Sequence, residues 1–160
     1  MPAGSEPADR DVTSGLPRTF RPLGVRVAIS VFGTLLVAVC VAAWLAFPPH
    51  IRAEFTVFQR LTLLAVGGAL AAAGHALARS RLVARTGGLT VVNGYRTRRY
   101  EWAEVLAVSL RPGSPWATLD LSDGTSVAAM GIQGSDGPRA ARQVKDLRAL
   151  VEAFTRTNGH

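Results

Sequence analysis

The chain has 160 residues, of which 48% are hydrophobic and 18% are charged, and its formal net charge is +7. This length allows about one domain, and the charged fraction lies below the roughly 25% of an average soluble domain. The composition therefore argues against a wholly soluble protein and indicates that part of the chain lies in lipid. The positive charge favours an acidic partner surface, either lipid headgroups or nucleic acid. A single cysteine, Cys40, excludes an internal disulfide.

Residues 1–24 contain prolines, glycines and scattered charges without any apolar periodicity. Segments of this composition cannot bury enough apolar surface to offset the entropy of folding. We therefore expect a disordered cytoplasmic tail over residues 1–24.

Two apolar runs follow, and each is long enough to cross a bilayer. The run Val27–Phe47 holds 21 residues without a charge, which at ~1.5 Å per residue covers the ~30 Å of a hydrocarbon core. The run Leu61–Leu77 is shorter, and Arg60 and Arg79 flank it. The sequence predicts transmembrane helices at residues 25–47 and 61–79, joined by an external loop at residues 48–60.

Gly67, Ala71 and Gly74 share one face of the second span. Small residues let helix backbones approach closely in lipid. The first span is the simplest partner for this face, and a second copy of the chain, giving a homo-oligomer, is the alternative.

Arginines orient the two spans. Three precede the first span and three follow the second, whereas the connecting segment holds two, Arg52 and Arg60. Because positive charge is enriched on the cytoplasmic side, this asymmetry predicts that both termini are cytoplasmic. The protein is then a multi-pass protein of the cell membrane.

The second half of the chain reads as short strands separated by turns. Asn93-Gly94 is a strong hairpin signal after an apolar strand. A three-residue loop, Ser122 to Gly124, would pair Leu119 with Val127 and keep the apolar side chains on one face, with Gly124 in the left-handed conformation. Six or seven antiparallel strands are expected in all.

A helix from Pro138 to Phe154 should follow, with Ser135 or Asp136 as its cap. One face of it is apolar, and the residues on that face are Ala140, Val144, Leu147, Val151 and Phe154. We expect an α + β membrane protein, in which a two-helix transmembrane hairpin precedes a small antiparallel β-barrel or sheet that is capped by this helix. The residues expected to be structural are Trp102, Gly94, Gly124, Leu147, Val151 and Phe154.

The segments "GLTVVNG", "YEWAEV", "LDLSDGTSVAAM" and "RQVKDLRALVEAF" resemble the bacterial pleckstrin-homology-like (PH-like) domains. They are most similar to the actinobacterial type named for low-molecular-weight protein antigen 6, which also carries two preceding spans. The step from Trp102 through Glu104 to Val105 is the most specific shared feature. The resemblance implies a PH-like fold over residues 80–155, followed by a tail at residues 156–160. It implies little about function.

Six arginines lie early in this module, and they are the candidate lipid- or partner-binding residues: Arg79, Arg81, Arg85, Arg96, Arg98 and Arg99. Arg96 and Arg98 share one strand face and could dock the module on anionic lipid headgroups of its own membrane. A basic strand can also be a solvated edge that discourages aggregation. A specific headgroup pocket is disfavoured, because the loop at Asn93-Gly94 is too short to wrap a headgroup.

The sequence contains almost no residues that could form a catalytic site. The histidines are His50, His75 and His160, and none can pair with Cys40, which lies in the first span. We identify no catalytic, cofactor-binding or metal-binding residue and expect no cofactor. Membrane tethering disfavours nucleic acid as a partner. The sequence predicts a membrane-anchored, non-enzymatic interaction module on the cytoplasmic face, an adaptor or assembly factor with an unidentified membrane or cytoplasmic protein partner.

Overall fold

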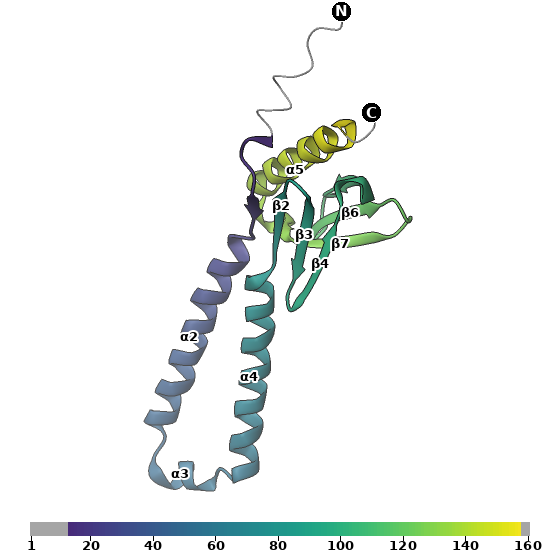
Figure 1. Ribbon diagram of the computed structural model, residues 1–160. Coiled ribbons are helices and arrows are strands. Elements are labelled where there is room, and N and C mark those ends of the chain that lie inside the picture. The colour runs from purple at the N-terminus through teal and green to yellow at the C-terminus, as the bar shows by residue number, and fades with distance from the viewer. Residues whose placement is uncertain (1–12, 158–160) are drawn as a thin grey trace, which may run out of the picture.

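A computed structural model of the protein describes residues 13–157. Two long helices stand side by side, and a domain of strands and one further helix sits at one end of them (Figure 1). The first part of the chain comprises β1 (Arg18–Phe20), α2 (Gly24–Ala46), α3 (Pro49–Glu54) and α4 (Val57–Arg79). The second part comprises β2 (Arg81–Arg85), β3 (Gly88–Asn93), β4 (Arg96–Tyr100), η1 (Trp102–Glu104), β5 (Val105–Ser109), β6 (Trp116–Leu121), β7 (Ser126–Gln133), η2 (Gly134–Asp136) and α5 (Pro138–Thr157).

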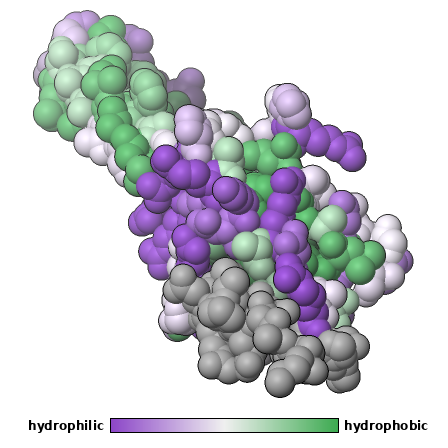
Figure 2. All heavy atoms as spheres, turned by 90° about the horizontal axis from the view of Figure 1, so that it is seen from above, coloured by the Kyte–Doolittle hydropathy of each residue, from purple (hydrophilic) through white to green (hydrophobic). Residues whose placement is uncertain are grey.

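The helices α2 and α4 are predominantly apolar, and their charged residues lie near the helix ends. Each has 23 residues, and in the described part of the chain these two are long and apolar enough to cross a membrane, judged by length and composition. Thr56 caps the start of helix α4, and its hydroxyl accepts from the Gln59 backbone N–H in a capping box. Seen from above, hydrophobic side chains gather on the lobe that projects from the domain (Figure 2).

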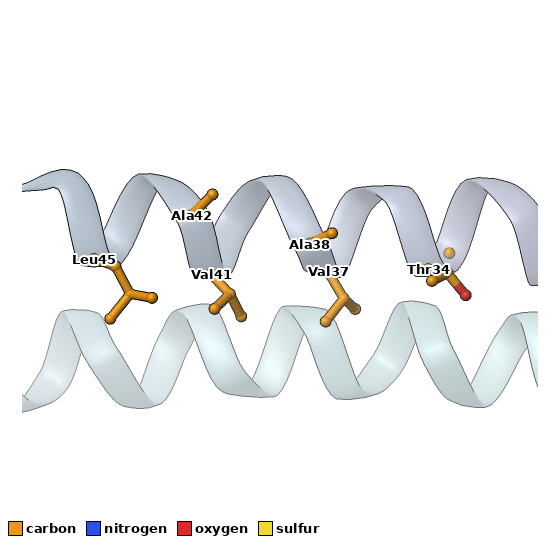
Figure 3. A pocket seen from close by; sticks show the side chains of 7 residues that line it. Thr34, Val37, Ala38, Val41, Ala42 and Leu45 are labelled. Atoms are coloured by element: carbon orange, nitrogen blue, oxygen red, sulfur yellow. The ribbon is translucent and has the colours of Figure 1, made fainter.

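The two helices converge toward the domain (Figure 1), and at the far end Arg60 of α4 lies over the Trp44 ring of α2. A Cβ on Gly74 of α4 would lie 3.1 Å from Ile29 Cγ2 of α2, whereas a Cβ on Gly67 or Gly68 would meet nothing within 4 Å. Farther from the domain, an apolar groove runs along α2, and Val37, Val41 and Leu45 point from it toward the neighbouring helix (Figure 3). Of the small-residue face expected on the second span, Gly74 makes the close approach to the first.

The strands of the described residues form two antiparallel sheets, ordered β1-β2-β3-β4 and β5-β6-β7. The sequence left a barrel and a sheet as alternatives, and the structure shows that the sheets do not close into a barrel. Where they approach most closely, Gly131 of β7 lies against the backbone of β2. A Cβ at Gly131 would be 2.6 Å from the Leu82 nitrogen, so this crossing requires glycine.

Strand β1 corrects the expectation of a disordered tail over residues 1–24. Arg18 to Phe20 pair with β2, and Phe20 lies opposite Leu82 with only 2% of its surface exposed. Arg18 also forms a 2.6 Å ion pair with Asp146 of α5. A segment that lies before the first long helix therefore completes the sheet that follows the second, because the helix hairpin returns the chain to the same end. Residues 1–12 lie outside the described residues.

The hairpin between β6 and β7 has the register that the apolar pattern predicts. Leu119 pairs with Val127, and Gly124 has a φ of +81°. Asp123 accepts hydrogen bonds from the Thr125 hydroxyl at 2.7 Å and the Thr125 backbone N–H at 2.8 Å, and these bonds lower the pKa of its carboxyl group. The three-residue loop is confirmed.

Helix α5 closes the open end between the two sheets. Its buried face contributes Val144, Leu147 and Val151 to a core that both sheets share. The Trp102 ring stacks on Phe154, with ring centroids 4.8 Å apart, and its indole N–H donates to the Arg85 carbonyl oxygen at 2.9 Å. The helix ends at Thr157, and residues 158–160 of the expected tail are outside the described range.

Candidate interaction surface

The six arginines singled out in the sequence are divided between two regions. Arg79 ends α4, Arg81 and Arg85 begin and end β2, and β4 carries the other three, Arg96, Arg98 and Arg99. Because a strand advances about 3.3 Å per residue, Arg85 lies roughly 13 Å beyond Arg81, at the far end of the strand. The structure therefore brings Arg79 close to the Arg96 end of β4, whereas Arg85 lies at the opposite end of the sheet.

The tip of the β3–β4 hairpin lies against the last turns of α4 (Figure 1). The Tyr95 hydroxyl donates to the Ala72 carbonyl oxygen at 3.1 Å and lies 3.0 Å from His75 Nδ1. Because the Tyr95 proton is used by Ala72, a hydrogen bond to His75 requires a proton on Nδ1. The Arg79 guanidinium lies 5.8 Å from the centre of the Tyr95 ring. We call these contacts, together with those of Gly94, the tip contact.

Gly94 and Ser80 fix the backbone at the tip contact. The Ser80 hydroxyl is buried; it donates to the Ala76 carbonyl oxygen and accepts from the Gly94 N–H at 3.0 Å. Gly94 has a φ of +61°, and a Cβ there would lie 3.3 Å from the Ala76 Cβ. The turn comprises Gly94 and Tyr95, since Asn93 already pairs with Arg96. Sequence reasoning missed Ser80, whose role depends on a residue fourteen positions away.

Asn93 joins the two sheets. Sequence reasoning identified Asn93 only as a turn residue and missed this role. Its side-chain amide donates to the Ala128 carbonyl oxygen at 2.5 Å and accepts from the Met130 N–H at 3.1 Å. This pair of bonds holds the β3–β4 hairpin to β7. The hairpin is therefore supported on one side by β7 and at its tip by α4.

Asp136 provides another link between the domain and the helices. Its carboxylate accepts from the backbone N–H groups of Leu23 and Gly24 at 3.0 and 2.8 Å, which are the free donors at the start of α2. Asp136 was one of two expected caps of the final helix, with Ser135 as the alternative, and it caps α2 instead. A negative charge at this helix end is also favourable for the helix dipole.

Tyr95→Phe should loosen the tip contact without unfolding the domain. The substitution removes the contacts of the hydroxyl with Ala72 and His75 but keeps the ring beside Arg79. Each lost bond contributes about 1 kcal/mol, so the loss of both, about 2 kcal/mol, should make amide hydrogen exchange at residues 94–96 up to roughly thirtyfold faster.

Tyr100→Phe in the same hairpin is the matched control for this substitution. The buried Tyr100 hydroxyl has no hydrogen-bond partner among the described residues, so its removal should leave exchange at the tip unchanged. Equal exchange rates in the Tyr95→Phe variant and the parent would show that the tip contact does not hold the hairpin.

The part of the chain that carries these features matches a known family. Residues 79–150 match the family model described as Bacterial PH domain. These residues form a PH-like domain, called the PH domain below. The match begins at the last residue of α4, so strand β1 completes the sheet of the PH domain from outside the matched segment.

Curated relatives of the chain come from mycobacteria. Uncharacterized proteins of Mycobacterium tuberculosis and Mycobacterium bovis are each 35% identical to it over 100 residues, which is 62% of this chain. The match spans 65% of the length of each relative. No solved structure matches the chain. A PH-like domain suggests an interaction module, and the contacts described above define which surfaces of the domain are already used.

Proposed function

We propose that this protein is a membrane-anchored, non-enzymatic interaction module that holds its PH domain on the cytoplasmic face. Helices α2 and α4 are the two spans in this proposal, and the arginine asymmetry sets their orientation. The supporting observation is that the domain is joined to the helix hairpin in three ways: β1, which leads into α2, pairs with β2; Asp136 bonds to the start of α2; and the tip contact reaches α4. Because these contacts fix the domain relative to the helices, the same surface of the domain always faces the cytoplasm. A constant exposed surface suits an adaptor or assembly factor.

The polar and charged side chains of the domain fit an interaction role better than a catalytic one. Among residues 13–157, no group of three or more His, Cys, Asp or Glu side chains could hold a metal ion. Several carboxylates serve structure: Asp123 orders a turn, Asp136 caps a helix and Asp146 pairs with Arg18 of β1. Interaction through an exposed sheet edge or a groove beside the terminal helix needs no such group.

Site-specific photo-crosslinking in living bacteria tests this function. A photoreactive residue is placed in turn at exposed positions of the domain, such as Thr97, Asp123 and Ala141, in the full chain and in a chain that lacks residues 1–78. We expect discrete protein adducts from at least one position of the full chain and loss of these adducts from the truncated chain. Absence of protein adducts at every position would contradict the adaptor function.

The orientation gives a prediction of its own. A reporter that is active only in the cytoplasm should be active when it is fused after His160. The same reporter inserted at His50, in the segment between the two spans, should be inactive. Because the helix hairpin returns the chain to one side, the opposite pair of results would invert the topology and place the domain outside the cell.

Contact with anionic lipid is the second candidate function, and the tip contact favours it. Tyr95 lies beside α4 residues that precede Arg79, so the start of β4 sits at the level where the proposed span leaves the bilayer. Aromatic residues favour this interface, and each basic residue near an anionic leaflet contributes roughly 1 kcal/mol of attraction.

Amide hydrogen exchange of the full chain in lipid nanodiscs tests whether the domain contacts anionic lipid. Anionic lipid should slow amide exchange along β4 relative to neutral lipid, and salt should reverse the effect because it screens exposed charges. The variant Arg96→Gln should reduce the difference, whereas Arg142→Gln on the exposed face of α5 should not. Identical exchange in both lipids would exclude leaflet docking.

A further inference from the structure

Strand β4 is an open edge of the larger sheet. It pairs with β3 on one side, and no other strand of the described residues pairs with its second side. Four of its five residues are exposed, and Tyr100 alone is partly buried. The strand leads from the tip contact up into the domain (Figure 1). An edge of this kind presents unpaired backbone donors and acceptors to another chain.

The register identifies which backbone groups are open. In a hairpin with a two-residue turn, the two residues that flank the turn form a hydrogen-bonded pair, here Asn93 and Arg96. Pairing then alternates along the strand. Arg96, Arg98 and Tyr100 therefore direct their backbone groups toward β3. Thr97 and Arg99 direct their N–H and C=O groups toward the open side.

The side chains of β4 add a strong charge preference. Arg98 lies opposite Val91 on the face that bears the core, and Arg99 lies opposite Thr90 on the other face. No hydrogen bond or ion pair joins Arg96, Arg98 or Arg99 to another side chain of residues 13–157, whereas Arg18 on the opposite edge of the sheet has Asp146. An added strand would meet arginine on both of its faces.

A second copy of this chain does not suit the edge. In an antiparallel pair of two β4 strands centred on Arg98, Arg98 of one copy would lie opposite Arg98 of the other, and Arg99 would lie opposite Thr97. The strand contains no acidic residue that could offset these charges. Like charges directly opposite each other destabilise a strand pair. The same charges attract an acidic strand.

The direction of β4 also argues against contact of the whole strand with the membrane leaflet. Only the Arg96 end adjoins α4, and Arg99 lies about 10 Å farther along the strand. A membrane surface would reach one end, whereas an extended segment could follow the full edge. We propose that β4 binds an extended acidic segment of a partner protein, which adds to the sheet as a further strand. This inference rests on the proposed interaction function and names its surface and partner chemistry.

Fluorescence anisotropy with the full chain in neutral nanodiscs tests the inference. The probe is a short fluorescein-labelled peptide of alternating glutamate and threonine. One control peptide has glutamine in place of glutamate, and another keeps the glutamates but is N-methylated at alternate backbone nitrogens. We expect saturable binding of the probe that weakens as salt rises, and at least roughly tenfold weaker binding of both controls.

Two variants separate the backbone from the charge. Thr97→Pro removes an open N–H but no hydrogen bond of the β3–β4 ladder, a position where an edge strand tolerates proline. Arg98→Glu reverses a charge and retains every backbone donor. Each should weaken probe binding at least roughly tenfold, with the near-ultraviolet circular dichroism of the domain retained. Arg142→Glu, with the same change of charge on α5, should bind as the parent does.

Several outcomes would overturn the inference. These are absence of probe binding, equal binding of the N-methylated peptide, and binding that Arg98→Glu leaves intact. Slower amide exchange along the whole of β4 in anionic than in neutral nanodiscs, measured without the probe, would identify the leaflet as the occupant of β4 and would also overturn it. The photo-crosslinking test remains independent, since adducts from Asp123 or Ala141 would sustain the interaction function even if β4 binds no peptide.

Discussion

Leu147→Asp should abolish cooperative unfolding of the PH domain. Leu147 is fully buried at the centre of the face that α5 packs between the two sheets. Truncation of a buried leucine to alanine costs about 2–5 kcal/mol, and an unpaired buried charge adds several more. This sum approaches or exceeds the ~5–15 kcal/mol stability of a whole domain. Thermal unfolding followed by near-ultraviolet circular dichroism should therefore show no transition.

Ala141→Asp on the exposed side of the same helix is the control. It adds the same charge near the start of α5, where a negative charge is favourable, so the transition should persist at or slightly above the parent temperature. A Leu147→Asp variant that melts like the parent would show that α5 does not close the space between the sheets.

Phe20→Ala should destabilise the PH domain by about 3–5 kcal/mol, although Phe20 precedes the first long helix. Its side chain is 2% exposed and belongs to the core that both sheets and α5 share. Chemical denaturation of the full chain in detergent, followed by the near-ultraviolet signal, measures the free energy of unfolding. The change should appear as a lower midpoint with an unchanged slope.

Thr19→Ala tests whether the effect is specific to the buried position. Thr19 lies on the same strand and is exposed, so its substitution should change the free energy of unfolding by less than about 0.5 kcal/mol. A fragment of residues 79–160 should be less stable than the full chain by at least the effect of Phe20→Ala, since it lacks β1 altogether. Equal stability of fragment and full chain would mean that β1 contributes nothing to the domain.

Much of the fold could be predicted because its signals are local. The two long helices appear as uninterrupted apolar runs, and the β6–β7 register follows from alternation and a glycine at the turn. The apolar face of α5 follows from a helical period over consecutive turns. The basic character of β4 is also visible in three arginines within four residues, but its position as an open edge is not.

The positions of β1, Asp136 and Tyr95 were decided by the tertiary structure alone. Phe20 meets Leu82 after the chain has passed twice along the helix hairpin, and Asp136 meets Gly24 across more than a hundred residues. Such contacts join a side chain or a short strand to a backbone far away in sequence, so they leave no periodicity to read. The sequence by itself determines two apolar helices followed by a small antiparallel domain. Long-range pairing determines that the segment before the first helix completes this domain, and that the hairpin carrying β4 is held against α4 with its outer edge open.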